Sequence, residues 1–217
     1  MKDFSKDKIK LIIADDHAVV RRGLIQILSE TSDMTVIAEV ENGNDLIDKI
    51  REIQVDIVLL DVCMPGKSGW DVLIQLRAEH PELPVIILSI SPEKDYAVKF
   101  FRAGASGYLH KTSAPAQLVE AIRKVARGGK YVTPEIAEKL AYDVDTSAEK
   151  QPHDTLSPRE FQILCLIASG KTVKEIAAEL SLSVPTISTY RTRILEKMEM
   201  KTNAQLTHYA FKNKLID

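Results

Sequence analysis

The sequence predicts an α/β first domain, with a five-stranded parallel sheet doubly wound by helices, and an all-α second domain of four helices. Two observations support this prediction. Short runs rich in Val, Ile and Leu alternate with helical patterns in the first part of the chain, as is typical of strands buried on both faces of a parallel sheet. From residue 154 onward only helical patterns occur, and three of them begin with a capping signal.

The first domain has its expected strands and helices in strict alternation, which favours a parallel sheet with helices on both sides. The strands are expected at residues 10–14, 36–38, 55–60, 85–88 and 107–109. The helices are expected at about residues 20–28, 45–53, 72–76, 96–102 and 118–126. Gly128 and Gly129 end the last helix, because glycine readily adopts the left-handed conformation that terminates helices.

The second domain is predicted from its helix starts. Ser157, Thr172 and Thr202 each fit a capping box, with Glu or Gln three residues later, and Ser183 can cap a further helix. The four helices are expected near residues 158–169, 173–180, 184–199 and 203–213. A short helical segment (134–142) and a polar stretch precede them. The predicted boundaries are therefore 8–129 for the first domain, 130–153 for the linker and 154–217 for the second domain.

Composition excludes several classes of protein. Hydrophobic residues make up 45% and charged residues 28% of the 217 residues, but no apolar run approaches the about eighteen residues that span a bilayer. The charged start lacks the apolar core of a signal peptide, so a cytoplasmic protein without a membrane partner is expected. Cys63 and Cys165 lack metal-ligand spacing. From Asp154 onward there are 9 basic and 7 acidic residues, so charge alone is weak support for nucleic-acid binding.

Reactive side chains stand at the carboxyl ends of four expected strands. Asp15 and Asp16 follow the first strand, Asp61 the third, Ser89 the fourth and Lys111 the fifth. In a flavodoxin-like strand order, 2-1-3-4-5, these four strands are neighbours, and ligands bind beyond the carboxyl ends of the strands. We therefore expect the five side chains to surround one crevice.

The chemistry of this set favours phosphoryl transfer to an aspartate. Three clustered carboxylates repel one another, and Mg²⁺ relieves the repulsion because it takes oxygen ligands from carboxylates, phosphate and water. An aspartate can accept a phosphoryl group as an acyl phosphate, and the transfer mainly requires positioning and charge stabilisation. Lys111 supplies a positive charge to the phosphoryl oxygens, and Ser89 supplies a hydroxyl donor.

About residues 8–128 resemble the receiver domain of two-component response regulators. The resemblance rests on Asp15-Asp16, the run Asp61-Val62-Cys63-Met64-Pro65-Gly66-Lys67-Ser68-Gly69, Ser89, and Tyr108 three residues before Lys111. It implies that Asp61 is the phosphoacceptor for a sensor histidine kinase. It also implies that no residue is catalytic, and that the acyl phosphate is lost only slowly. The chain departs from the family at Thr112, where proline or an acid is common.

The same resemblance assigns the remaining roles in the crevice. Asp16, Asp61 and the backbone carbonyl of Cys63 would bind Mg²⁺, with Asp15 binding directly or through water. Ser89 and Tyr108 would form the switch pair: the hydroxyl moves toward the phosphate and the ring fills the space behind it. Lys111 would stabilise the phosphoryl group.

The second domain contains a predicted helix-turn-helix at residues 172–199. Ile176, Leu180, Ile187 and Ile194 belong to an apolar face that would pack its two helices across the turn. The face left outside carries hydroxyl and guanidinium groups, and a helix of this kind fits the major groove of DNA.

About residues 154–217 resemble the LuxR/NarL-type DNA-binding domain. The resemblance rests on the runs Leu156-Ser157-Pro158-Arg159-Glu160, Lys174-Glu175-Ile176-Ala177, Val184-Pro185-Thr186-Ile187-Ser188-Thr189-Tyr190 and Ile194-Leu195-Glu196-Lys197-Met198. It implies that double-stranded promoter DNA is a partner, with Ser188, Thr189 and Thr192 facing the bases. The implied phosphate contacts, which position without specifying sequence, are Thr186, Tyr190, Arg191, Arg193, Lys174 and Lys197. Val173 stands where the family often has asparagine.

The last helix leaves an alternative open. It resembles the family's dimerising helix, which implies a homodimer in the active state, but Leu206, Tyr209 and Phe211 could equally be core residues. Phosphorylation could act by releasing the second domain or by promoting dimerisation, and the sequence does not choose between them.

Two other protein classes share parts of this pattern. A haloacid-dehalogenase-type phosphatase also uses an aspartate and Mg²⁺, but it needs two aspartates separated by one residue, and Asp15-Asp16-His17 lacks that spacing. A flavin-binding redox domain shares the expected fold class, but no Ser/Thr-rich phosphate loop follows the first strand.

Overall fold

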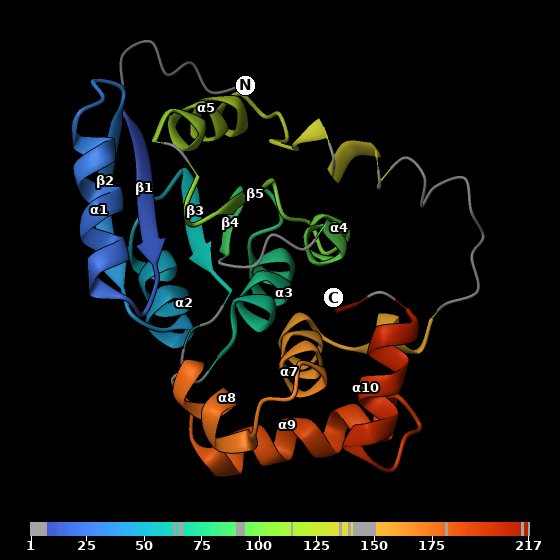
Figure 1. Cartoon of the computed structure of the whole chain (residues 1–217). Coiled ribbons are helices and arrows are strands. Elements are labelled where there is room, and N and C mark those ends of the chain that lie inside the picture. The colour runs from blue at the N-terminus through green and yellow to red at the C-terminus, as the bar shows by residue number, and fades with distance from the viewer. Residues whose placement is uncertain are drawn as a thin grey trace. The chain divides into compact units, whose positions relative to one another are not determined.

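The chain consists of two compact units, residues 1–146 and 147–217 (Figure 1). The computed structural model describes residues 8–62, 64, 67–89, 94–113, 115–134, 136–138, 140, 151–180, 182–213 and 215–216. Within these ranges, no helix is both long enough and apolar enough to cross a membrane.

The first unit is built on a five-stranded parallel sheet in the order β2-β1-β3-β4-β5, which confirms the predicted order. The strands are β1 (Ile9–Ala14), β2 (Met34–Val40), β3 (Ile57–Asp61), β4 (Val85–Ser89) and β5 (Gly107–His110). Every residue of β3 and β4 is buried, as the continuous apolar runs predicted. The strand β2 is longer than predicted. Half-buried and exposed residues alternate along most of it, at the edge of the sheet, so its sequence shows only a short apolar run.

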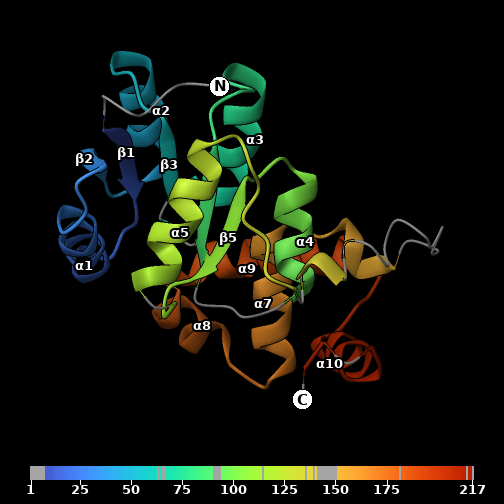
Figure 2. The ribbon, with the colours of Figure 1, turned by 90° about the horizontal axis from the view of Figure 1, so that it is seen from above.

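Among the residues that the structure describes, five helices cover the two faces of this sheet. They are α1 (Ala18–Ser29), α2 (Gly43–Glu52), α3 (Gly69–Glu79), α4 (Lys94–Arg102) and α5 (Pro115–Ala126). In Figures 1 and 2, α1 and α5 lie on one face, and α2, α3 and α4 lie on the other. Leu11, Leu59 and Leu88 pack with Leu28 of α1 and Ile122 of α5 in one apolar cluster. Burial on both faces explains why the strands are apolar throughout.

The start of α3 lies directly against the phosphoacceptor candidate. This helix begins at Gly69, three residues before the predicted start, because the side chain of Ser68 caps it by accepting the backbone N–H of Asp71. A Cβ atom added at Gly69 would lie 2.2 Å from the carbonyl oxygen of Asp61. Only glycine therefore permits this close approach between α3 and the end of β3.

The end of α5 has the predicted glycine termination. Gly128 has a φ of 84°, and Gly129 donates its backbone N–H to the carbonyl of Lys124 at 3.1 Å. Tyr131, two residues after Gly129, forms a parallel bridge with Gly107 of β5. Of the predicted segment 134–142, the described residues 134, 136–138 and 140 are helical, and Ile136 is buried.

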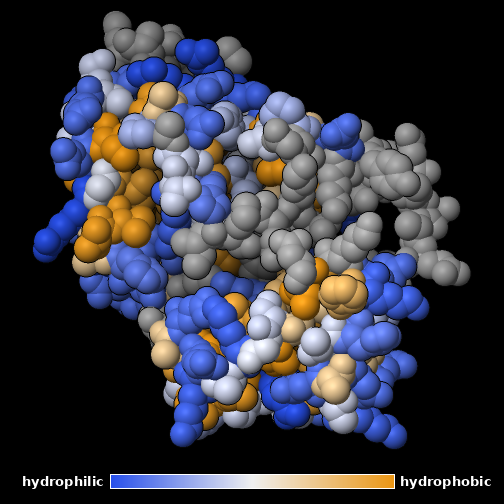
Figure 3. Space-filling view, in the orientation of Figure 1, coloured by the Kyte–Doolittle hydropathy of each residue, from blue (hydrophilic) through white to orange (hydrophobic). Residues whose placement is uncertain are grey.

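The surface of the first unit has an apolar region beside α1 (Figure 3). Leu24, Ile25 and Ile27 of α1 and Val119 of α5 are only partly buried. A shallow groove along α1 and α5 is lined by Ile27 and Val119 together with charged side chains such as Glu120 and Arg123.

The second unit is helical, and all four predicted caps are present. The helices are α7 (Pro158–Ala168), α8 (Val173–Glu179), α9 (Val184–Lys197) and α10 (Asn203–Lys212), after a 3₁₀ turn at Pro152–Thr155. Ser157, Thr172 and Thr202 form complete capping boxes, and Ser183 accepts the backbone N–H of Thr186. The helix α9 ends two residues before its predicted end, and Glu199 just beyond it has a φ of 55°.

The three apolar residues of the last helix, α10, differ in their burial. Leu206 is fully buried, whereas Phe211 is 69% exposed. Tyr209 is half-buried, and its hydroxyl lies 2.8 Å from Nδ1 of His153. The helix α10 therefore supplies core residues and also leaves an aromatic ring at the surface.

This division predicts different stability effects along α10. Replacing Leu206 with alanine is expected to lower the free energy of unfolding by about 2–5 kcal/mol, because it removes fully buried methyl groups and leaves a cavity. The matched variant Phe211→Ala is expected to change it by no more than about 0.5 kcal/mol, because that ring is mostly exposed. Urea denaturation followed by circular dichroism measures both. Equal effects would contradict the assignment of Leu206 to the core.

Candidate functional site

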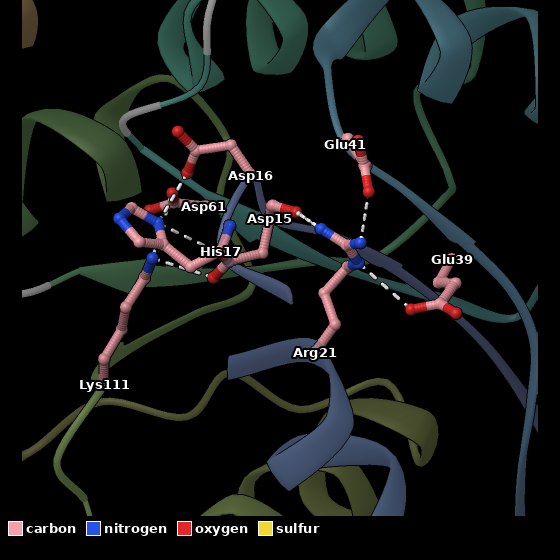
Figure 4. Close-up of polar contacts among 8 residues, drawn as sticks. All are labelled: Asp15, Asp16, His17, Arg21, Glu39, Glu41, Asp61 and Lys111. Carbon is pink, nitrogen blue, oxygen red and sulfur yellow. Dashed lines mark hydrogen bonds and ion pairs between the residues drawn. The ribbon is translucent and has the colours of Figure 1, made fainter. Parts of the chain in front are cut away.

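The carboxyl ends of β1 and β3 bring two acids to one ammonium group (Figure 4). Asp15 follows β1 and Asp61 ends β3, and both are almost completely buried. The Nζ atom of Lys111, one residue beyond β5, lies 2.7 Å from Oδ2 of Asp15 and 2.9 Å from Oδ2 of Asp61. Residues far apart in the sequence therefore form one buried ion-paired cluster, as the strand order predicted.

Asp16 and His17 complete the mouth of this cluster. The imidazole Nδ1 of His17 lies 2.6 Å from Oδ1 of Asp16, and the backbone N–H of His17 donates to Oδ1 of Asp15 at 2.8 Å. Asp15, Asp16, His17 and Asp61 each have one atom that could bind a metal ion, and these four atoms lie within 4.8 Å of one another. Sequence reasoning missed His17, although its place directly after two acids at a strand end was a usable signal.

The balance of charge in the cluster keeps Lys111 protonated. Burial lowers the pKa of Lys111, but Asp61 and Asp15 raise it more strongly, so the net pKa lies above its ordinary value. A lysine whose folded pKa is raised contributes stability that is present below its unfolded pKa and is lost as pH rises through the folded pKa. That loss falls in the alkaline range, so the ion pairs remain formed at neutral pH.

The other predicted residues of the first unit are placed as follows. Ser89 ends β4 and is 3% exposed. Tyr108 on β5 is 5% exposed, and its ring centroid lies 6.2 Å from that of Phe100 on α4, so the ring is packed inward in this structure. Cys63, whose carbonyl was predicted as a metal ligand, lies outside the described residues.

In the second unit, α9 exposes the predicted base-facing residues. Ile187 and Ile194 are fully buried, whereas Ser188, Thr189 and Thr192 are exposed on another side of the helix. Each of these three hydroxyls donates to the carbonyl four residues earlier, at 3.0 to 3.1 Å. The hydroxyl protons are thus used within the helix, and the remaining lone pairs can accept hydrogen bonds from outside.

The predicted phosphate contacts fall into two groups. Lys174 and Arg193 are exposed. Tyr190 is half-buried, as are Thr186 and Arg191, and Lys197 is exposed. Arg191 donates to Asn203 at 2.6 Å, Lys197 pairs with the buried Glu160 at 2.6 Å, and the Thr186 hydroxyl lies 2.7 Å from that of Ser183.

Comparison with known families accounts for both units. A model of the response regulator receiver domain matches residues 11–123, and a model of bacterial regulatory proteins of the luxR family matches residues 154–210. The chain belongs to the response regulators. This response regulator carries a receiver domain followed by a LuxR-type DNA-binding domain, as both resemblances implied.

Relatives match over nearly the whole chain. The response regulator GacA of Pseudomonas syringae pv. syringae is 34% identical over 210 residues, which cover 96% of this chain and 98% of GacA. The oxygen regulatory protein NreC of Staphylococcus carnosus is 36% identical over 216 residues, which cover 96% of this chain and all of NreC. A structure of two RcsB dimers bound to two parallel DNAs matches with a TM-score of 0.57 and 25% identity, over 94% of this chain and 98% of that one.

Proposed function

We propose that Asp61 of this response regulator is the phosphoacceptor, and that its phosphorylation by a sensor histidine kinase controls binding of a homodimer to promoter DNA. The single observation that supports this most strongly is the buried ammonium of Lys111 between Asp15 and Asp61. A fixed positive charge beside the acceptor oxygen favours phosphoryl transfer, because it stabilises the charge on the phosphoryl oxygens.

The proposed reaction is a displacement at phosphorus. An oxygen of the Asp61 carboxylate forms a bond to phosphorus while the bond from phosphorus to the kinase histidine breaks, and its electron pair stays on the imidazole. Lys111 and the hydroxyl of Ser89 would hold the phosphoryl oxygens. The product is an acyl phosphate, which we expect the protein to lose only slowly, because no residue is assigned to activate water.

The acidic cluster fits a magnesium ion. Among the described residues, Asp15 and Asp61 share the ammonium of Lys111, and a third carboxylate, Asp16, lies in the same cluster. Carboxylate oxygens are the ligands that Mg²⁺ prefers. We propose that Asp16, Asp61 and the carbonyl of Cys63 hold the ion. Asp15 would act through water, because its two oxygens already accept the His17 N–H and the Lys111 ammonium. Bound Mg²⁺ would neutralise charge on the arriving phosphoryl group.

The switch would run from the pocket to the second domain. We propose that the Ser89 hydroxyl moves toward the phosphate and that the ring of Tyr108, which packs on Phe100 of α4, fills the space behind the hydroxyl.

We propose domain boundaries at residues 8–129 for the receiver, 130–153 for the linker and 154–217 for the DNA-binding domain. The DNA partner implies a cytoplasmic site of action.

The exposed face of α9 is the proposed DNA-reading surface. Ser188, Thr189 and Thr192 would face bases and Lys174 and Arg193 would contact phosphates, because all five are exposed. Thr186, Tyr190, Arg191 and Lys197 remain proposed phosphate contacts, and Lys197 would have to exchange Glu160 for DNA. The RcsB structure with two dimers on two DNAs supports both a homodimer and a DNA partner.

Replacing Arg193 with alanine is expected to weaken binding to every DNA sequence about equally and to lower the salt slope of log K by about one. The reason is that one exposed guanidinium would no longer displace a counterion from the backbone. Mobility shifts on specific and unrelated DNA at several salt concentrations measure both effects. The control Arg123→Ala, in the first unit, should change neither. A loss confined to the specific sequence would show that Arg193 reads bases.

The proposed function is tested by treating the protein with acetyl phosphate and Mg²⁺. The expected result is a mass gain of one phosphoryl group, which chelation of Mg²⁺ prevents, and a changed mobility shift on the DNA upstream of its own gene. The preparation should neither hydrolyse a chromogenic phosphate ester nor be yellow. Rapid ester turnover would indicate the phosphatase alternative, and a flavin spectrum would indicate the redox alternative.

A further inference from the structure

Arg21, in the first turns of α1, joins three segments behind the acidic cluster. Arg21 is only 6% exposed, and each of its three guanidinium nitrogens has a hydrogen-bond or ion-pair partner. Nη1 donates to the backbone carbonyl of Asp15 at 2.7 Å, Nε donates to Glu39 of β2 at 3.0 Å, and Nη2 pairs with Glu41. Figure 4 shows Arg21 on the other side of Asp15 from Asp61 and Lys111. Arg21 therefore supports the cluster without entering it.

The contact with the Asp15 carbonyl distinguishes Arg21 from a surface ion pair. Glu39 and Glu41 have exposed side chains, at 49% and 68%, and ion pairs with exposed acids contribute little to stability. The backbone N–H of Asp15 still bonds to Val40 of β2 at 3.2 Å, but the chain then turns into α1. The buried carbonyl at this turn needs a donor, and Arg21 supplies it.

That carbonyl belongs to the peptide between Asp15 and Asp16, so its direction sets where Asp16 points. The Asp15 carboxylate is already fixed by Lys111 and by the N–H of His17. The Asp16 carboxylate is held by the imidazole of His17, which is itself 57% exposed. The orientation of Asp16 therefore depends on its backbone, and the backbone is held by Arg21.

We propose that Arg21 is a positioning residue for the divalent cation: by holding the Asp15 carbonyl, it directs the Asp16 carboxylate into the cluster. This inference rests on the proposed function, since it concerns the same pocket. A purely electrostatic role makes the opposite prediction. Removing a positive charge near three carboxylates would strengthen cation binding, whereas losing the orientation of a ligand weakens it.

The test measures Mn²⁺ binding to the full chain by the electron paramagnetic resonance signal of free Mn²⁺. The variants Arg21→Lys, which keeps the charge but not the planar fork, and Arg21→Met, which removes the charge, are both expected to bind Mn²⁺ about 10-fold more weakly. Glu41→Gln, which keeps the contact with Asp15, should stay within about twofold. Arg123→Met, which breaks the exposed pair with Asp33, should match the wild type.

A second measurement separates positioning from a general loss of structure. Acetyl-phosphate labelling of Arg21→Lys should need about 10-fold more Mg²⁺ for half of the maximal rate, yet reach nearly the wild-type maximum at saturating Mg²⁺. Arg21→Lys provides this answer even if Arg21→Met fails to fold. A lower maximum with an unchanged Mg²⁺ requirement would overturn the inference.

The outcomes for the inference and for the proposed function differ. If the wild type binds Mn²⁺ and accepts the phosphoryl group, but Arg21→Lys binds Mn²⁺ equally well or more tightly, the positioning role of Arg21 is wrong and the proposed function stands. If the wild type neither binds Mn²⁺ nor accepts the phosphoryl group, the proposed function fails, and the inference fails with it.

Discussion

Replacing Asp61 with asparagine is expected to abolish the phosphoryl gain from acetyl phosphate. The amide nitrogen and oxygen of asparagine lack the charge that makes a carboxylate oxygen a nucleophile, and the variant also removes one proposed Mg²⁺ ligand. Asparagine has nearly the same shape as aspartate, so the contact between β3 and Gly69 is retained. Intact mass after incubation with acetyl phosphate and Mg²⁺ measures the effect, and the phosphate-dependent change in DNA binding should vanish with it.

Asp56 provides the matched control on the same segment. It lies just before β3, at the end of the strand opposite to Asp61, and its Oδ2 accepts the backbone N–H of Lys10 at 3.0 Å. Asp56→Asn should accept the phosphoryl group as the wild type does. Continued labelling of Asp61→Asn, or loss of labelling in Asp56→Asn, would place the phosphoacceptor elsewhere.

The pocket could be predicted because its residues stand at strand ends. The apolar runs before Asp15, Asp61 and Ser89 identify buried strands, and a single choice of strand order makes their carboxyl ends neighbours. The contacts of Lys111 with Asp15 and Asp61 then follow from topology. Parallel strands place all their carboxyl ends at one edge of the sheet, which groups these residues whatever their separation in the sequence.

The support behind the pocket could not be predicted in the same way. Arg21 and Glu39 are 18 residues apart in the sequence, on α1 and β2, and a charged residue near the start of a helix carries no sequence signal that it is buried. The start of α3 is set locally by the cap that Ser68 provides, but the close approach of Gly69 to Asp61 depends on tertiary packing. Similarly, the pairing of Lys197 in α9 with Glu160 in α7 joins two residues that are 37 positions apart in the sequence.

Replacing Lys111 with methionine is expected to lower the free energy of unfolding at neutral pH by about 3 kcal/mol, and to lower it less when Mg²⁺ is present. Methionine keeps most of the side-chain volume but leaves two buried carboxylates without their shared ammonium, and breaking a buried ion pair from one side is strongly destabilising. A cation that binds only the folded state restores stability by mass action. Mg²⁺ should therefore stabilise this variant more than the wild type.

Urea titration followed by the fluorescence of Trp70, the single tryptophan of the chain, measures this effect in the unit that contains the pocket. Lys49→Met is the matched control, since it breaks the exposed pair with Glu52 and should cost no more than about 0.5 kcal/mol, with no dependence on Mg²⁺. The same Lys111 variant should still gain the phosphoryl group slowly, because Asp61 is intact, but should no longer couple that gain to DNA binding. If Mg²⁺ stabilised the wild type and Lys111→Met equally, the cation and the ammonium would not be acting on the same carboxylates, and the proposed pocket would be wrong.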